Sequence, residues 1–176
     1  MRGALIEELN APESGPADIL EQAMGPDMPE GALREALISL RASGKRDDTR
    51  TANAVEAALH ETDPERRWDC YKGAFFGAQG NPYKSLFNAE AGKDANVVAL
   101  FGTKDEIGSE VLRVHDVSAR LKLAAAVERT TALIQVGLDA LIAYQDEKRR
   151  RGALDFDDLI RKTRDLLTRT GMSDWV

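Results

Sequence analysis

Apolar residues recur along this chain at steps of three and four, which is the period of an α-helix, and alternating strand patterns are nearly absent. The segment 30–43 shows the pattern clearly, since its apolar side chains share one face: Leu33, Ala36, Leu37 and Leu40. Ser43-Gly44 then supplies a helix stop, because glycine readily adopts the left-handed conformation that ends a helix. The pattern predicts an all-α fold with several short helices.

Aspartates mark the starts of the next two helices. Asp47 or Asp48 can cap a helix whose apolar face carries Ala54, Val55, Ala58 and Leu59. Asp63-Pro64 is a clear start, because aspartate caps a helix and proline fits its first position. The helix that it opens carries the most aromatic stretch of the chain, which we interpret as core: Trp68, Cys70, Tyr71, Ala74 and Phe75.

Glycine, asparagine and proline then interrupt the helical pattern. Gly77, Gly80 and Asn81-Pro82 predict a loop that leads into Tyr83 and Lys84. The segment 93–101 is apolar enough to be buried, and we expect a short helix there, with a strand as the alternative.

One helix is predicted to be far longer than the others. From about Ser109 to Arg151 the chain has no proline, and Gly137 is its only glycine. Some forty residues at about 1.5 Å each would span roughly 60 Å, a length typical of a coiled-coil-like arm or a strut. A kink at Gly137 is one option, since glycine weakens a helix interior. The apolar stripe runs along Val114, Val117, Leu121, Ala124, Val127, Ile134, Leu138 and Leu141.

A last helix opens at Asp155, where Asp155 and Asp158 have the spacing of a capping box. We expect this returning helix to end near Thr170-Gly171. Its apolar residues define a face that we expect to be buried: Phe156, Leu159, Ile160, Thr163, Leu166 and Leu167.

Composition and charge limit the class of protein. The 176 residues are 43% hydrophobic and 31% charged, which favours a folded domain over disorder. The net charge of −6 is uneven, with 12 basic and 19 acidic residues up to Gly108, and 12 and 11 from Ser109 onward. This balance argues weakly against nucleic-acid binding, except through a local basic strip. A single cysteine, Cys70, and the lack of a signal peptide or an apolar run of about 20 residues predict a cytoplasmic protein without a membrane partner.

The candidate catalytic and metal-binding motifs do not have the residue spacing that their chemistry requires. Ser43-Gly44-Lys45-Arg46 looks like the end of a phosphate loop, but Ser39 stands where that motif needs glycine, and Arg46 where it needs serine or threonine. His60 and His115 lack the companions of a zinc site. We therefore expect neither catalytic residues nor a bound metal in this chain.

Two charged groups near the C-terminus each allow two interpretations. Asp155, Asp157 and Asp158 would hold magnesium or act as acid and base, or they cap a helix and fill its first turn, where the dipole favours anions. We favour the structural role, because adjacent positions on a helix diverge by about 100°. The basic run at 148–151 either matches the negative end of the helix dipole or contacts phosphates.

The stretch 148–160 resembles a segment of the UvrD/RecB-like helicases, in which a long helix ends in a tyrosine-containing basic run. Tyr144 and residues 148–151 fit that run. Residues 40–57 and 80–86 are similar to the AddA subfamily in particular. The family's Leu-Asp-Phe-Asp-Asp-Leu signature follows without departure, at Leu154, Asp155, Phe156, Asp157, Asp158 and Leu159.

This resemblance implies a function. AddA proteins are ATP-dependent DNA helicase–nucleases that pair with AddB in double-strand break repair and recombination. We expect this chain to be a piece of such a helicase that covers the helical insertion, the 1B-type subdomain, of its first motor domain. ATP and magnesium would belong to the parent protein, and this piece would have no cofactor and no catalytic motif. DNA and an AddB-like subunit would be its partners.

The resemblance also divides the chain and assigns its contacts. Residues 1–29 would be an unassigned helical segment, 30–151 the insertion, and 152–176 the returning helix that packs on the motor domain. The signature would be structural. The alternative is a stand-alone α-helical interaction module that docks a partner helix and does not bind DNA. The expected DNA contacts are Tyr83, Lys84, Lys148, Arg149, Arg150 and Arg151.

Overall fold

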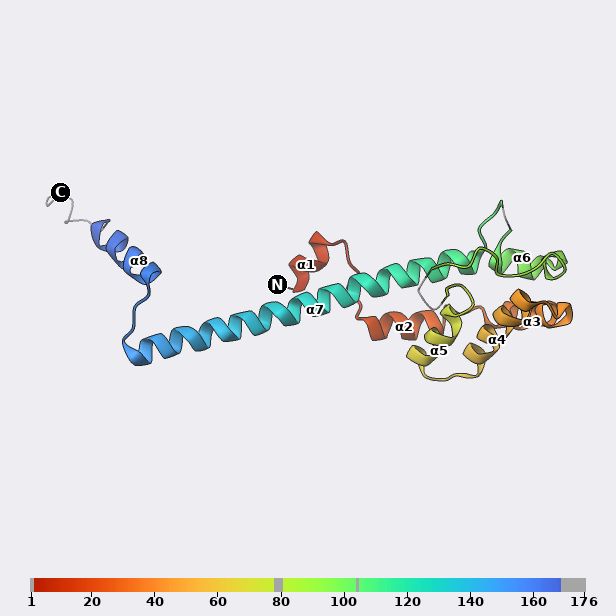
Figure 1. The fold of residues 1–176 in the computed structure, drawn as a ribbon, viewed down its shortest axis with the longest axis horizontal. Coiled ribbons are helices and arrows are strands. Elements are labelled where there is room, and N and C mark those ends of the chain that lie inside the picture. The colour runs from red at the N-terminus through yellow and green to blue at the C-terminus, as the bar shows by residue number, and fades with distance from the viewer. Residues whose placement is uncertain (1, 78–80, 104, 169–176) are drawn as a thin grey trace. The chain divides into compact units, whose positions relative to one another are not determined.

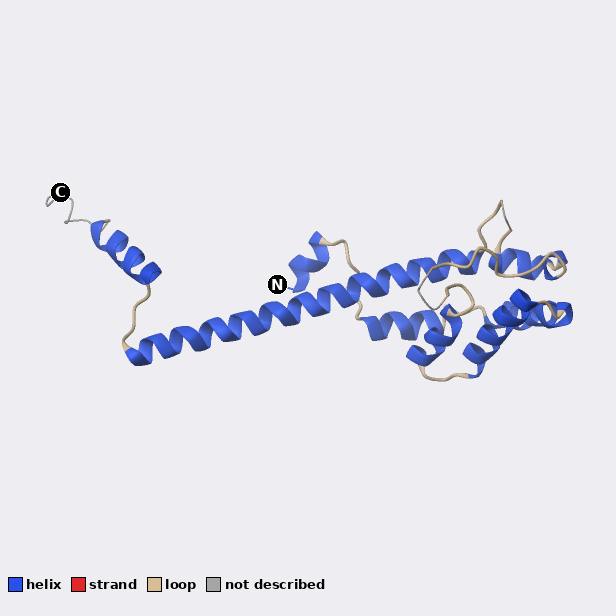
Figure 2. Cartoon of the chain, viewed as in Figure 1, coloured by secondary structure: helices blue, strands red, loops and turns tan. Residues whose placement is uncertain are grey.

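The computed structural model describes residues 2–77, 81–103 and 105–168. Throughout these residues every regular element is helical (Figure 2), which confirms the all-α prediction. The elements, labelled in Figure 1, are α1 (Arg2–Glu8), α2 (Pro16–Met24), α3 (Glu30–Ser43), α4 (Arg46–His60), α5 (Pro64–Lys72), the 3-10 turn η1 (Ala91–Lys93), α6 (Ala95–Phe101), α7 (Ser109–Arg151) and α8 (Phe156–Leu167). The predicted bounds of the long helix, 109–151, are those of α7.

The chain forms two compact units, Met1–Arg129 and Thr130–Val176, and their boundary falls inside α7. We call them the N-terminal unit and the C-terminal unit. The N-terminal unit holds α1 to α6 and the first half of α7, and the C-terminal unit holds the rest of α7 and α8. The division at residues 29 and 151 that follows from the helicase resemblance stays a prediction.

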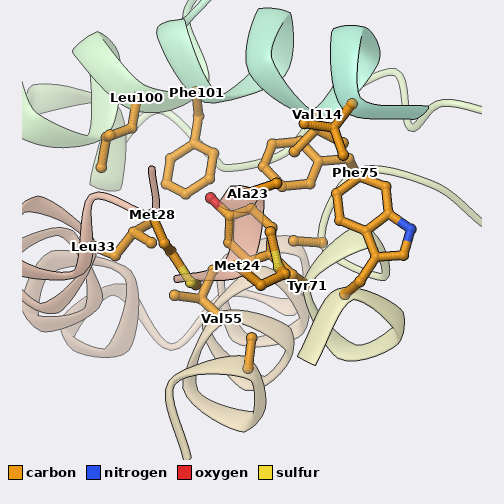
Figure 3. Packing of buried hydrophobic residues seen from close by; sticks show 14 of the residues in the cluster. Ala23, Met24, Met28, Leu33, Val55, Tyr71, Phe75, Leu100, Phe101 and Val114 are labelled. Carbon is orange, nitrogen blue, oxygen red and sulfur yellow. The ribbon is translucent and has the colours of Figure 1, made fainter. Parts of the chain in front are cut away.

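The core lies in the N-terminal unit, where α4 packs against α3 and α5, and α6 packs against α3. The predicted apolar faces of α3 and α4 supply its centre, because Leu33, Leu40 and Val55 are fully buried. The first half of α7 closes the cluster with Val114, and Figure 3 shows this side chain beside those of the other helices. The helical period therefore identified the part of the core that α3 and α4 supply, whereas the buried residues of α2, among them Ile19 and Met24, were not predicted.

A buried polar network joins α7 to two other helices. The Tyr71 hydroxyl of α5 donates to Glu110 Oε2 at 2.5 Å, and Arg113 Nη2 donates to the same carboxylate oxygen at 2.7 Å. Arg113 Nη1 also donates to the carbonyl of Ala23 in α2, at 2.7 Å. Burial raises the pKa of Tyr71 well above its usual value. The buried hydroxyl and carboxylate are tolerated here because each has hydrogen-bond partners.

In the N-terminal unit, three helix ends were predicted from sequence signals, and two of the three follow them. Gly44 adopts the left-handed conformation, with φ of 60°, and ends α3. Asp63 caps α5 by accepting from the Arg66 N–H at 2.9 Å. The expected cap of α4 was wrong, however, because the capping position is Lys45. Asp48 is instead fully buried, and it accepts from the Ser43 hydroxyl and from the Asn88 N–H.

The aromatic segment and the segment after the loop are both helical. Helix α5 ends at Lys72, but Ala74 and Phe75 beyond it are still buried with Trp68 and Tyr71, as the interpretation of this stretch as core requires. Residues 95–101 form α6, so the helix alternative for this segment is confirmed and the strand alternative is wrong. Gly80 lies outside the described residues.

The C-terminal unit departs from the expected burial. The apolar stripe of α7 leaves the core after Val127, and Leu138 and Leu141 are exposed. The expected buried face of α8 is also exposed, with Phe156 at 80% of its full accessible surface. The pattern therefore predicted both helices correctly, but the expected burial of the α8 face was wrong, because no described element covers it. The expected end of the helix, at Thr170-Gly171, lies outside the described residues, and α8 itself ends at Leu167.

Among the described helices, none combines the length and apolar character that crossing a membrane requires.

Candidate nucleic-acid interface

The residues predicted to contact DNA lie in two places, one in each unit. Tyr83 and Lys84 follow the loop of the N-terminal unit, whereas the basic run 148–151 ends α7 in the C-terminal unit. Each place is built by a different set of contacts.

Helix α4 holds the Tyr83 segment in position. The Tyr83 N–H donates to the Phe75 carbonyl at 2.9 Å, next to an isolated backbone bridge between Phe76 and Pro82. The Arg50 guanidinium of α4 stacks over the Tyr83 ring, with its central carbon 3.7 Å from the ring centroid. Arg50 Nη2 also donates to the Ser85 carbonyl at 2.9 Å. The tyrosine is therefore held from both the backbone and the ring, as a cation–π pair.

Sequence reasoning missed Arg50, which lies 35 residues before Ser85. No local spacing links α4 to this segment. Lys84, by contrast, is exposed, and no other described residue forms an ion pair or hydrogen bond with its ammonium. Of the two predicted residues, Tyr83 is therefore fixed by contacts with its neighbours, whereas Lys84 is an exposed cation.

In the C-terminal unit, Lys148 is enclosed by carboxylates. Its side chain keeps only 9% of its accessible surface, and its ammonium lies 2.6 Å from Asp155 Oδ2 and also contacts Asp158. Hydrogen bonds to the two aspartates raise the pKa of Lys148 above its usual value. The hydrogen bond from Lys148 lowers the pKa of Asp155 to about 2 and also lowers that of Asp158. The ammonium is therefore occupied in this structure and is not available to a phosphate.

The same aspartates start α8. Asp155 Oδ1 accepts from the Asp158 N–H at 2.9 Å, and the Asp158 carboxylate accepts from the Asp155 N–H at 3.3 Å, which is the predicted capping box. Tyr144 donates to Asp155 Oδ2 at 3.3 Å. We call Tyr144, Lys148, Asp155 and Asp158 the Lys148 cluster. This cluster joins the C-terminal end of α7 to the first turn of α8. The lysine neutralises the two aspartates that begin α8.

The three arginines after Lys148 remain at the surface. Arg149 pairs with Asp146, and Arg150 and Arg151 both pair with Glu147, at 2.8 and 2.5 Å. The hydrogen bonds from Arg150 and Arg151 lower the pKa of Glu147. All three arginine side chains are exposed, and exposed ion pairs of this kind are weak enough to exchange for another anion. They are the cations of the basic run that a phosphate can reach.

The apolar residues of the signature lie at the protein surface. Leu154, Phe156 and Leu159 are all exposed, and so is Asp157. The signature thus has two parts: Asp155 and Asp158 fix the helix start, while the apolar residues begin a face that continues along α8 through Ile160 and Leu167.

His60 and His115 are both exposed and lie on different helices. Across the part of the chain that the structure describes, no group of three or more histidine, cysteine, aspartate or glutamate side chains is arranged to hold a metal ion.

No protein-family model, curated protein or solved structure matches this chain. The helicase family is therefore an expectation that rests on residues 148–160 and the looser similarity before them.

Proposed function

We propose that this chain is an accessory DNA-contacting and scaffolding part of a UvrD/RecB-like helicase of the AddA type, without catalytic residues of its own. The observation that carries the proposal is the arrangement at the end of α7. There, the family's signature lies beside a basic run, and the two aspartates of the signature bind Lys148. ATP, magnesium and an AddB-like subunit would act with the parent protein.

The two halves of this arrangement support two roles. Arg149, Arg150 and Arg151 are exposed cations at a helix end, which is the chemistry that phosphate contacts need. The exposed apolar face of α8 is the kind of surface that docks on another domain, since an isolated helix does not gain stability from an uncovered apolar face. In this proposal the Lys148 cluster holds the DNA-contacting end of α7 and the docking helix together.

A second function has a specific observation in its favour. The apolar stripe of α7 is exposed beyond Val127, at Leu133, Leu138 and Leu141, and the face of α8 is exposed too. Both are surfaces onto which a partner helix could pack, so a stand-alone interaction module without DNA binding is the alternative.

Binding to labelled single-stranded and forked DNA tests the two functions against each other. We expect anisotropy to report binding at low salt that weakens as salt rises, because phosphate contacts release counterions. Replacing Arg149, Arg150 and Arg151 together with glutamine should weaken binding on the order of tenfold or more. The salt slope, which is the slope of the logarithm of the binding constant against the logarithm of the salt concentration, should fall in magnitude by about three.

The matched control replaces three other cations of the C-terminal unit, Arg161, Lys162 and Arg164, with glutamine. An equal loss in both triple variants would mean that only net charge matters and would remove the assignment to the end of α7. Absence of binding at the lowest salt would favour the interaction module.

A further inference from the structure

A groove of about 390 Å³ lies in the N-terminal unit between α7 and the segments 75–76 and 82–86. This volume is within the range of small-ligand sites, roughly 300–1,000 Å³. The segment supplies an apolar wall that is rich in aromatic rings: Phe75, Phe76, Pro82, Tyr83 and Leu86. One face of α7 supplies the other wall and includes Val111, His115, Ser118 and Lys122.

The described lining of the groove carries a lysine and no carboxylate, although the chain up to Gly108 is acidic overall. His115 and Lys122 are both exposed, and among the described residues that line the groove none is acidic. The chain up to Gly108 nevertheless carries 19 acidic residues against 12 basic ones. No described carboxylate forms an ion pair with Lys122, in contrast to Lys72 and Lys93 of the same unit. A groove with an unpaired lysine but no carboxylate favours an anionic ligand.

The aromatic wall is already in place without a ligand. Arg50 stacks on the Tyr83 ring at 3.7 Å, and the Tyr83 N–H is bound to the Phe75 carbonyl. Phe75 is itself almost fully buried and packs in the core with Val114 (Figure 3). Binding therefore need not order these rings, which removes one of the usual costs of binding.

We propose that this groove binds one nucleotide of a single DNA strand, with the base on the aromatic wall and the phosphate at Lys122 and His115. Aromatic rings beside a cation are the combination that binds single-stranded nucleic acid without reading its sequence. The inference rests on the proposed function, since it assumes that the chain contacts DNA. It adds a second contact, in the N-terminal unit, to the arginines at the end of α7.

The test measures the affinity of the full chain for a labelled oligothymidylate of twelve nucleotides. Lys122→Ala should weaken binding by roughly fivefold or more and lower the salt slope by about one, the effect of losing one phosphate contact. Tyr83→Leu, which keeps an apolar side chain but removes the ring, should weaken binding by roughly fivefold or more and leave the salt slope unchanged. Lys93→Ala is the control, because Lys93 is an exposed lysine of the same unit that does not line the groove.

A second measurement does not depend on substitutions. Adding the oligonucleotide to the ¹⁵N-labelled chain should shift the amide signals of residues 111–122 and 82–86. Signals that stay in place while the oligonucleotide binds would overturn the groove as a site, whatever the variants do.

The outcomes separate this inference from the proposed function. Lys122→Ala and Tyr83→Leu could bind DNA like the original chain while the triple arginine variant binds more weakly. In that case the groove is not a nucleotide site, and the proposed function stands. If the groove variants lose affinity and the triple variant keeps it, the groove is confirmed as a nucleotide site. The assignment of phosphate contacts to the end of α7 is then wrong. No binding by the original chain would overturn both. Thymidine monophosphate that binds as tightly as the oligonucleotide would replace the DNA strand by a free nucleotide and overturn the assignment to DNA.

Discussion

Asp48 is fully buried in the first turn of α4, where it accepts hydrogen bonds from Ser43 and Asn88. Asp48→Ala should lower the free energy of unfolding by about 2–4 kcal/mol, because two donors would lose their acceptor inside the protein. Urea denaturation followed by circular dichroism measures the loss. Asp47→Ala is the matched control, since Asp47 lies in the same turn but is only half-buried. Equal losses for both would mean that the helix dipole, and not burial, makes Asp48 important.

The Lys148 cluster predicts how the C-terminal unit responds to acid. Lys148 lowers the pKa of Asp155 from its usual 3.8 to about 2. A carboxylate whose pKa is lowered in the folded state contributes stability above pH 3.8, and this contribution is lost as the pH falls toward 2. The ion pairs between Lys148 and the two aspartates should therefore persist at neutral pH and break only in strong acid.

The carboxyl carbon of Asp155, followed by NMR during a pH titration, measures this pKa directly. Lys148→Met should move the midpoint upward from about 2 toward 3.8, because the main partner of the carboxylate is removed. A midpoint that does not change in Lys148→Met would show that the capping hydrogen bond, and not the lysine, sets this pKa.

Sequence reasoning at this scale identified residues whose partners are local. Asp155 and Asp158 of the capping box are three positions apart, and so are Asp63 and Arg66, so the sequence shows their spacing directly. Asp48 with Asn88 and Arg50 with Ser85 are separated by 40 and 35 residues. A single sequence carries no signal for pairs at that distance, because they meet only after α4 has packed.

At the scale of elements, α3 and α8 have the same kind of apolar pattern but different surroundings. Leu33 in α3 is fully buried, whereas Phe156 in α8 is exposed. Leu33→Ala should cost about 2–5 kcal/mol of stability, since it opens a cavity in a packed core. Phe156→Ala should change the free energy of unfolding by about 0.5 kcal/mol or less, because it removes no contact in the core.

Thermal or urea unfolding of the two variants in parallel checks this difference. A loss for Phe156→Ala that approaches the loss for Leu33→Ala would mean that α8 packs on this chain in solution. In that case the exposed face would not be available to a motor domain or another partner.

At the scale of the whole molecule, the two units should differ in local stability although α7 runs through both. The first half of α7 buries Val114, Val117, Ala124 and Val127, while its second half exposes Leu133, Leu138 and Leu141. Amide hydrogen exchange should therefore be slow at residues 113–127 and much faster at residues 134–150, since only the first half must wait for the core to open. Mass spectrometry of peptides across α7 measures this change. Uniform protection along the helix would reveal a partner on the second half, such as another copy of the chain.

Taken by itself, the sequence determined where the helices from residue 30 onward form and where several of them begin or end, because period, caps and glycine stops act within a few residues. It also predicted the core of α3 and α4 and the bounds of α7. Only the tertiary structure decided which apolar faces are covered: those of α3 and α4 meet other helices, whereas no described element covers those of α8 and the second half of α7. Likewise, it showed that Lys148 binds Asp155 and Asp158 and that Arg50 holds Tyr83. The physical reason is that a helix depends on neighbours along the chain, whereas burial and ion pairing depend on which segments pack together in space.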